Sequence, residues 1–339
     1  MTTIRDIAKK AGVGVGTVSR VLNNNPRVSE KTRARVLQVI EDLGYKPNPV
    51  ARRLSQGKTL IISVIIPFFT RPGFSERLNG VVSELSQSKY NLLIHTIQTP
   101  EQRRTLSKEF PNQRFIDGAL ILSLPPLDEE IETLANADIP IVLIDSENPN
   151  LSMLHQVIVD DVAGGKAATE YLLSLGHRRI GFIGDVIDNP FHFTSSRDRY
   201  YGYREALQAA GITLRDTYYA EGEHGRLEAR EIAMRMLTIP ERPTAIFAAS
   251  DTQAVGVLEA ARQLELRVPE DLSVIGYDDI ELAEIMNLTT MHQKLFESGR
   301  LGVELLLKAL ENPDTAPIHE TLPVELTVRG STAPPSSTP

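Results

Sequence analysis

A short stretch near the start of the chain carries side chains that could hydrogen-bond to a polyanion. It combines small, hydroxyl, guanidinium and amide groups at Val15, Gly16, Thr17, Ser19, Arg20 and Asn23. A guanidinium matches the acceptors of a guanine edge, a valine methyl suits a thymine methyl, and hydroxyls and amides suit phosphate oxygens. We therefore expect Arg20 and Val15 to read bases of double-stranded DNA, while the other polar groups hold its backbone.

Two short helices joined by a glycine-containing turn would present this stretch. Thr3 followed by Asp6 predicts a capped helix that begins at Ile4 and stops at Gly12. A second helix begins near Val15, and its inward positions are Val18, Val21 and Leu22. This is the pattern of a helix-turn-helix, whose second helix enters the major groove of DNA.

A third helix should close the core of this region. It is capped by Ser29 and runs to Gly44, with its apolar side at Val36, Leu37, Ile40 and Leu43. An apolar stripe alone indicates only a helical bundle, but the charge is more specific. Residues 1–58 hold 12 Lys or Arg and 4 Asp or Glu, a net +8, whereas the other residues hold 24 and 40, a net −16. A basic head on an acidic body is typical of a nucleic-acid-binding protein.

Five motifs occur together in the first 54 residues, at positions 17–23, 28–29, 44–45, 47–48 and 51–54. Their combination resembles the lactose/galactose repressor (LacI/GalR) family of bacterial transcription regulators. The resemblance implies further DNA contacts from Thr3, Val28, Ser29 and Tyr45. It also implies a hinge helix that folds on operator DNA and contains Asn48, Ala51, Arg52 and Leu54, with the leucine wedged into the minor groove. Gly14 departs from the family, which usually has a capping serine there.

Composition predicts the broad class of the protein. The 339 residues are 41% hydrophobic and 24% charged, which suits two or three globular domains. The sequence contains no cysteine, no secretory leader pattern and no apolar run of membrane length. We expect a cytoplasmic protein with no metal site, no cofactor and no membrane partner.

After residue 58, short apolar segments alternate with helical ones. We expect strands at 60–66, 91–96, 118–122, 141–144, 157–159, 179–183, 244–248 and 272–275. We expect helices at 75–88, 128–135, 163–175, 198–210, 227–237, 252–264 and 296–310. Such alternation predicts an α/β body with doubly wound parallel sheets covered by helices on both faces. The Ser/Thr/Pro-rich segment 331–339 predicts a disordered tail.

Motifs in the body extend the resemblance, at 115–118, 139–142, 159–161, 175–181, 249–251 and 276–279. It implies a two-lobed core similar to periplasmic sugar-binding proteins. It also implies a homodimer on a pseudo-palindromic operator, with a small-molecule effector between the lobes. The implied divisions are a helix-turn-helix domain at 1–46, a hinge and linker at 47–58, and a core at 59–330. Lobe 1 would cover about 59–160 and 292–318, and lobe 2 about 161–291 and 319–330.

Polar and aromatic side chains follow the predicted strands, where the carboxyl ends of parallel strands form a cleft. They are Phe68, Phe69, Phe74, Ser123, Asp145, Phe191, Phe193, Arg199, Ser250, Asp251 and Asp278. Carboxylates and guanidiniums bind adjacent hydroxyls and aromatic rings cover apolar faces, so a mono- or oligosaccharide is the predicted effector. The resemblance supports Arg199 and Asp278 and adds Gln293, whereas relatives often have Asn where Ser250 stands. Each phenylalanine alone is equally consistent with core packing.

Enzymatic motifs are missing from the sequence. Gly165-Lys166 lacks the other residues of a P-loop, and there is no dinucleotide-binding glycine motif, zinc-protease motif or serine-hydrolase elbow. Two alternatives to a regulator stay open. A sugar-processing enzyme on a Rossmann-like fold would turn over its ligand, whereas a transport protein would need export and has no use for residues 1–54.

Overall fold

The computed structural model describes residues 2–45, 58–110, 115–146 and 148–336. The chain forms two compact units, Met1–Thr59 and Leu60–Pro339. We call them the head and the body and describe each by itself. The hinge positions Asn48, Ala51, Arg52 and Leu54 lie outside the described residues.

The head consists of helices α1 (Ile4–Ala11), α2 (Val15–Leu22) and α3 (Glu30–Asp42). Thr3 and Asp6 form the expected capping box at the start of α1. Gly12 ends α1 with a φ of +62°, a left-handed conformation that glycine adopts at little cost. Gly14 starts α2 without a side-chain cap, and Ser29 caps α3.

Seven apolar side chains form the core of the head: Ile7, Ala8, Ala11, Val18, Val21, Val36 and Val39. The expectation for Leu37 is wrong, because this side chain is 48% exposed. Leu37 follows Val36 by one residue, which turns it about 100° away from the core. Val39 and Ile40 continue the inward stripe instead.

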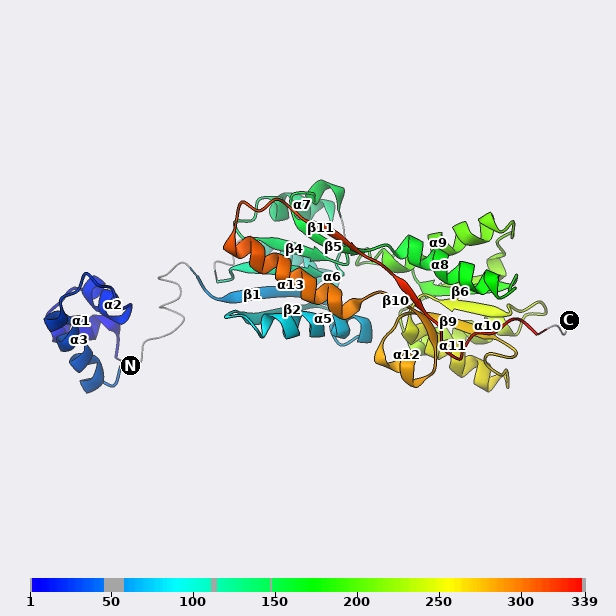
Figure 1. Cartoon of the computed structure of the whole chain (residues 1–339), viewed down its shortest axis with the longest axis horizontal. Coiled ribbons are helices and arrows are strands. Elements are labelled where there is room, and N and C mark those ends of the chain that lie inside the picture. The colour runs from blue at the N-terminus through cyan, green and yellow to red at the C-terminus, as the bar shows by residue number, and fades with distance from the viewer. Residues whose placement is uncertain (1, 46–57, 111–114, 147, 337–339) are drawn as a thin grey trace. The chain divides into compact units, whose positions relative to one another are not determined.

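The body contains two six-stranded sheets, each forming one lobe (Figure 1). The order in lobe 1 is β11-β5-β4-β3-β1-β2, with all neighbours parallel. Its strands are β1 (Ile61–Pro67), β2 (Asn91–Ile97), β3 (Gly118–Leu122), β4 (Ile141–Ile144), β5 (His155–Val159) and β11 (His319–Leu322). The order in lobe 2 is β12-β10-β9-β8-β6-β7, where only β12 is antiparallel. Its strands are β6 (Ile180–Asp185), β7 (Tyr219–Gly222), β8 (Ala245–Ala248), β9 (Ser273–Asp278), β10 (Thr289–His292) and β12 (Glu325–Thr327).

Helices cover both faces of each sheet, which confirms the predicted doubly wound α/β fold. In lobe 1, α5 (Pro72–Leu85) and α13 (Leu295–Glu311) pack on one face, and α6 (Pro100–Glu109) and α7 (Asp128–Ala135) lie on the other. In lobe 2, α8 (Asp161–Ser174) and α9 (Ser195–Ala209) pack on one face. The helices on the other are α10 (Arg226–Leu237), α11 (Asp251–Gln263) and the short α12 (Glu281–Ile285).

The end of the chain differs from expectation in two places. Strand β11, at His319–Leu322, pairs with β5, so it belongs to lobe 1 rather than lobe 2. The segment from Ser331 to Ser336 is not a free tail, because Ser331 is 3% exposed and exchanges hydrogen bonds with Val274 and Thr289. The polar residues here form backbone and hydroxyl hydrogen bonds with lobe 2 instead of a disordered tail.

Candidate functional site

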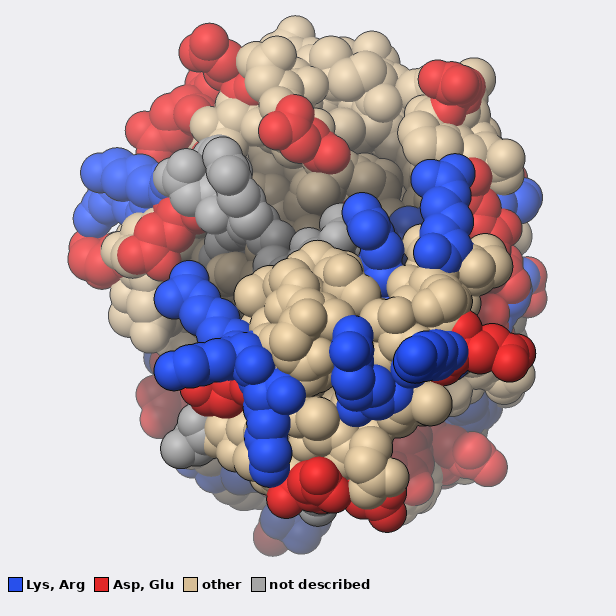
Figure 2. All heavy atoms as spheres, turned by 90° about the vertical axis from the view of Figure 1, so that its left-hand side faces the viewer, with Lys and Arg blue, Asp and Glu red and all other residues tan. Residues whose placement is uncertain are grey.

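The polar stretch of the head is accessible on its second helix. Val15, Gly16 and Arg20 are exposed on α2, and Thr17, Ser19 and Asn23 are partly exposed. The other expected contacts, Thr3, Val28, Ser29 and Tyr45, are also at least partly exposed. In Figure 2, Lys and Arg side chains surround an uncharged area on the near face. The surface therefore has both the positive charge and the exposed polar side chains that DNA contact requires.

Arg33 has a structural role in the head that the sequence patterns did not predict. Its Nη2 donates to Asn25 O at 2.8 Å, and its Nη1 donates to Asn24 Oδ1 at 3.1 Å. These bonds tie α3 to the turn that follows α2, and so hold α2 in place.

A cavity of about 130 Å³ lies between the lobes of the body. Eight of the expected effector residues line it: Phe74, Ser123, Asp145, Phe193, Arg199, Ser250, Asp278 and Gln293. Ser123, Asp145 and Asp278 leave their strands through backbone with φ of 49°, 55° and 113°. Such positive φ values are sparsely populated by non-glycine residues and cluster at functional sites.

Arg77 of α5 organises the lobe 1 side of the cavity, although it is only 2% exposed. Its Nη1 lies 2.9 Å from Asp145 Oδ2 and donates to Ser123 Oγ at 2.6 Å. Its Nε donates to Ser298 Oγ at 3.0 Å. The Gln293 Oε1 accepts from Arg77 Nη2 at 3.5 Å, so this network reaches the segment that crosses between lobes.

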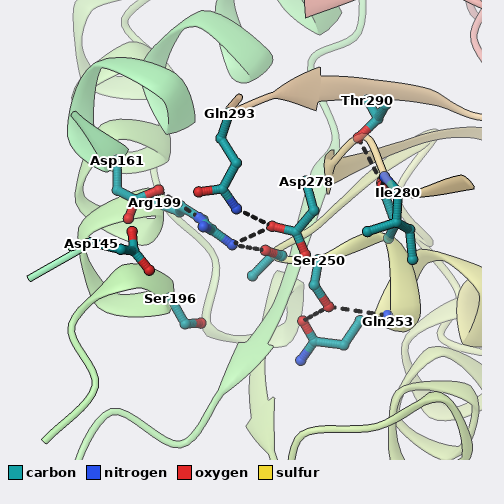
Figure 3. Close-up of polar contacts among 12 residues, drawn as sticks. Asp145, Asp161, Ser196, Arg199, Ser250, Gln253, Asp278, Ile280, Thr290 and Gln293 are labelled. Atoms are coloured by element: carbon teal, nitrogen blue, oxygen red, sulfur yellow. Dashed lines mark hydrogen bonds and ion pairs between the residues drawn. The ribbon is translucent and has the colours of Figure 1, made fainter. Parts of the chain in front are cut away.

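Arg199 of α9 organises the lobe 2 side (Figure 3). Its Nε donates to Asp161 Oδ1 at 2.8 Å, and its Nη1 donates to Ala249 O at 2.6 Å and Asp278 Oδ1 at 3.5 Å. The guanidinium also lies 3.7 Å from the centroid of the Tyr277 ring. Gln293 donates from Nε2 to the same Asp278, which joins the two arginine networks across the cleft.

Close packing of α8 and α9 brings Arg199 and Asp161 together. A Cβ atom at Gly165 would lie 2.1 Å from Arg199 O, and one at Gly202 would lie 2.0 Å from Val162 O. Only glycine at these two positions therefore allows the two helices to pack so closely. Gly202, three residues after Arg199 on α9, thus has a packing role, while Arg199 faces the cavity.

Buried charges in this cleft neutralise one another. Burial raises the pKa of Asp161, and the nearby Arg199 guanidinium limits that rise. Burial likewise raises the pKa of Asp278, against the opposing effect of Arg199. Burial by itself would lower the pKa of Arg199, but Asp161 and Asp278 outweigh it and keep the guanidinium charged.

Four expected effector residues do not line the cavity. Asp251 is fully buried at the start of α11, where it accepts from Thr290 Oγ1 at 2.6 Å and Ile280 N at 3.0 Å. Phe68 and Phe191 pack into the core of lobe 1, and Phe69 is 37% exposed outside the cavity. Position after a strand therefore did not distinguish residues that line the cavity from structural residues.

Several cavity residues were not expected from the sequence: Arg71, Arg77, Ser146, Asp161, Asp185, Asp198 and His224. Asp160 caps α8, which leaves the next residue, Asp161, to pair with Arg199. The position of Asp161 just after β5 was the sequence feature that could have predicted its place at the cavity. Arg77 gave no such feature, because it stands inside a helix beside Glu76 and Asn79, where a charged residue is ordinary.

Within the described ranges, no group of three or more His, Cys, Asp or Glu side chains could hold a metal ion. No helix in those ranges has the length and apolar character needed to cross a bilayer.

Comparison with known proteins matches both units to one kind of protein. Residues 3–48 match the model for bacterial regulatory proteins of the lacI family, and residues 169–332 match that for a periplasmic binding protein-like domain. The ribose operon repressor of Escherichia coli is 35% identical over 334 residues, which cover 98% of this chain and 100% of that repressor.

Two solved structures are similar over nearly the whole chain. The lac repressor dimer bound to operator and the anti-inducer ONPF has a TM-score of 0.79 at 28% identity, covering 98% of this chain and 99% of its own. A transcriptional regulator CelR–cellobiose complex has a TM-score of 0.72 at 31% identity, with 98% and 100% covered. These matches confirm the resemblance seen in the motifs. The chain therefore belongs to the lacI family of bacterial regulatory proteins, which are DNA-binding transcriptional repressors and not enzymes.

Proposed function

We propose that this protein binds a pseudo-palindromic operator as a homodimer and is switched by an uncharged, single-ring sugar in the cleft of the body. The observation that carries the proposal is the cavity itself. Its charged groups come from both lobes and are largely paired with one another, so a neutral polar ligand suits it best.

The balance of charge disfavours an anionic ligand. Three guanidiniums line the cavity, from Arg71, Arg77 and Arg199, against five carboxylates, from Asp145, Asp161, Asp185, Asp198 and Asp278. Arg77 and Arg199 already donate to carboxylates and carbonyls. A phosphate or carboxylate would add negative charge to an acidic pocket and would have to break these pairs.

Size and shape favour one sugar ring. The cavity of about 130 Å³ is smaller than the ~300–1,000 Å³ of pockets that hold drug-sized ligands. Phe74 and Phe193, with ring centroids 6.2 Å apart, offer an apolar surface for the C–H face of a sugar. Ser146 Oγ is buried at the same cavity without a hydrogen-bond partner among the described residues, and so is available to a ligand hydroxyl.

Arg71 supplies a free donor at the same cavity. Its guanidinium lies 4.0 Å from the centroid of the Phe68 ring. No side-chain hydrogen bond or ion pair of Arg71 occurs within the described part of the chain. Burial lowers the pKa of this group, and Asp185 and Glu223 oppose that effect. A ligand oxygen would satisfy Arg71 from lobe 1 while lobe 2 holds the other side of the ring.

The switch would act through the angle between the lobes. A ligand changes DNA binding only if it binds one lobe arrangement better than the other. The hinge expected at Asn48, Ala51, Arg52 and Leu54 would transmit the change, because paired hinges would open the minor groove at the centre of the operator. The protein would work in the cytoplasm, where the operator is.

Exposed apolar side chains support a dimer. Val82 on α5 is 46% exposed and Ile94 on the edge strand β2 is 40% exposed. Leu92 faces α5 in the core of lobe 1, so Ile94, two residues on, lies on the same face. In lobe 2, Ile285 on α12 is 71% exposed beside Met286. A second copy would bury these groups as in other symmetric dimers.

The test uses the melting temperature and DNA binding together. D-ribose, D-glucose, D-galactose and cellobiose are screened by thermal shift, each beside its phosphorylated form where one exists. Operator affinity, on a site selected from random DNA, is then measured with and without the sugar that binds. A chain that begins at Thr59 should bind that sugar and no DNA. Specific DNA binding by that shortened chain, or chemical conversion of the sugar, would contradict the proposal.

A further inference from the structure

One loop of lobe 2 reaches into lobe 1. Residues 186–194 connect β6 to α9, both in lobe 2. Phe191 of this loop is only 7% exposed, and it is buried in the core cluster of lobe 1 with Ile121 and Leu124. Its ring lies edge-on to Phe68 of lobe 1, with centroids 5.0 Å apart.

Asn189 gives this loop a defined shape. Its Oδ1 accepts from Phe191 N at 3.2 Å and Phe193 N at 3.0 Å, and its Nδ2 donates to Phe193 O at 3.0 Å. Five consecutive residues are thus held by one side chain. The shape of this segment is therefore fixed by bonds within the loop as well as by its contacts with lobe 1.

Arg103 of α6 holds the loop from the side of lobe 1. The guanidinium is 2% exposed and pairs with Glu130 through Nε at 3.0 Å and Nη2 at 2.6 Å. Its remaining nitrogen, Nη1, donates to the backbone carbonyl of Phe191 at 3.1 Å. Arg103 lowers the pKa of Glu130 against the effect of burial, together with Leu127 N and Ser107. The charged pair in lobe 1 thus presents one N–H group to lobe 2.

The docked loop also forms part of the effector cavity. The Phe193 ring stacks on Phe191, with centroids 5.4 Å apart and an interplanar angle of 11°. Phe193 lines the cavity, as does Phe74, whereas Phe191 and Arg103 do not. Displacing Phe191 would therefore move the aromatic surface that faces the ligand.

We infer that Arg103 is a positioning residue of the effector site, which docks the loop of lobe 2 on lobe 1 and thereby holds Phe193 over the cavity. A residue outside the cavity then sets both the aromatic surface and the ease of closing the cleft. The ligand part of this inference rests on the proposed function, and the docking part does not.

Docking can be measured with one fluorescent side chain, because the chain contains no tryptophan. Phe191→Trp places a reporter in the docked position, and Phe69→Trp gives an exposed reference. Arg103→Lys keeps the charge beside Glu130 but lacks the planar fork that reaches Phe191 O. Arg104→Lys is the matched control, because Arg104 is the next residue of α6 and is 56% exposed.

In Phe191→Trp, emission should be blue-shifted and poorly quenched by acrylamide. Adding Arg103→Lys should move both properties toward those of Phe69→Trp, while adding Arg104→Lys should leave them unchanged. Equal quenching with the two lysine variants would overturn the inference. A lower melting temperature with unchanged tryptophan emission would also overturn it, because Arg103 would then stabilise only lobe 1.

Chymotrypsin gives a second reading that needs no tryptophan. Cleavage after Phe191 should be faster in Arg103→Lys than in Arg104→Lys under native conditions. If Phe191→Trp fails to fold, this comparison decides whether the loop is docked by Arg103.

Ligand binding tests the second half of the inference, with D-ribose as the probe. Its affinity should fall about tenfold in Arg103→Lys, the effect of losing one charge-assisted hydrogen bond, and stay unchanged in Arg104→Lys. Unchanged affinity, together with a reporter tryptophan that has become accessible to acrylamide, would show that the docked loop does not serve the effector site. If none of the four sugars in the screen binds the unmodified protein, the proposed sugar effector is wrong, and the fluorescence comparison alone decides docking.

Discussion

Arg199 Nε lies 2.8 Å from Asp161 Oδ1, and the two side chains are only 7% and 9% exposed. The guanidinium is also bonded to Ala249 O and packed on the Tyr277 ring. Arg199 therefore joins α8, α9, β8 and β9 of lobe 2, in addition to facing the cavity. The sequence predicted the same ligand-binding role for Arg199 and Asp278. In the structure, the fold depends more on Arg199 than on Asp278.

Arg199→Ala should unfold lobe 2 more easily, even without ligand. Removing one partner of a buried ion pair leaves Asp161 uncompensated, at a cost of roughly 3–5 kcal/mol. Urea unfolding of the body should show this loss directly. A variant with unaltered stability and no sugar response would show that Arg199 serves only the ligand.

Asp278→Asn should have the opposite profile. The asparagine oxygen can still accept from Gln293, so the fold should keep most of its stability. Losing the carboxylate should weaken sugar binding by about one decade, which titration calorimetry would measure. Operator affinity without ligand should match that of the unmodified protein, and normal sugar affinity would remove Asp278 from the site.

Arg20→Ala should relax the choice of operator sequence, whereas Lys9→Ala should weaken all sequences evenly. Arg20 is exposed on α2, and a lost base contact costs roughly 1–3 kcal/mol at one position. A lost phosphate contact lowers the slope of log affinity against log salt by about one. Affinity for operators varied at each base separates the two effects, and an even loss for Arg20→Ala would assign it to phosphate.

Ile285→Asp should convert the proposed dimer to monomers. The isoleucine is 71% exposed on α12, and a carboxylate there would be desolvated in any symmetric interface. Sedimentation velocity measures the change, with Glu284→Gln on the same helix as a control. Operator affinity should fall with the dimer, since two heads would no longer be linked. An unchanged dimer would place the interface on another surface.

His177 should make the body less stable in mild acid. Burial lowers its pKa, against the effect of the Ala333 carbonyl 2.9 Å from Nε2. The unfolded chain thus binds more protons at this site, so the stabilisation is complete above about pH 6.5 and is lost as pH falls through the lowered pKa. Between pH 7.5 and 5, the melting temperature should drop further than in His177→Asn. Equal drops would assign the effect to other histidines.

The alternation of apolar and helical segments was enough to predict the doubly wound fold and most strands. It missed β7, β10, β11 and β12, because none of these strands has a continuous apolar run. It also missed α6, whose sequence is almost entirely polar. These elements are stabilised by pairing and packing with neighbouring elements. Their own sequences therefore show little of the pattern that predicts a strand or a helix.

The site was predictable where side chains end strands, as Asp145 and Asp278 do. It was not predictable where a helix residue points inward, as with Arg77, whose partners lie 46 and 221 residues away in sequence. Asp251 and Phe191 do not line the cavity as predicted, because a position in a loop does not show where its side chain points. The Asp251 carboxylate accepts a hydrogen bond from Ile280 N, and the Phe191 ring packs into lobe 1. Only the fold brings such partners together.

The chain passes between the lobes three times, so the sixth strand of each sheet comes from residues 319–327. On a ribosome the head emerges first, and its three helices have a core of their own. Neither sheet of the body can be completed until β11 and β12 have left the exit tunnel. Synthesis therefore produces the DNA-binding head before it completes the body that holds the cavity between its lobes.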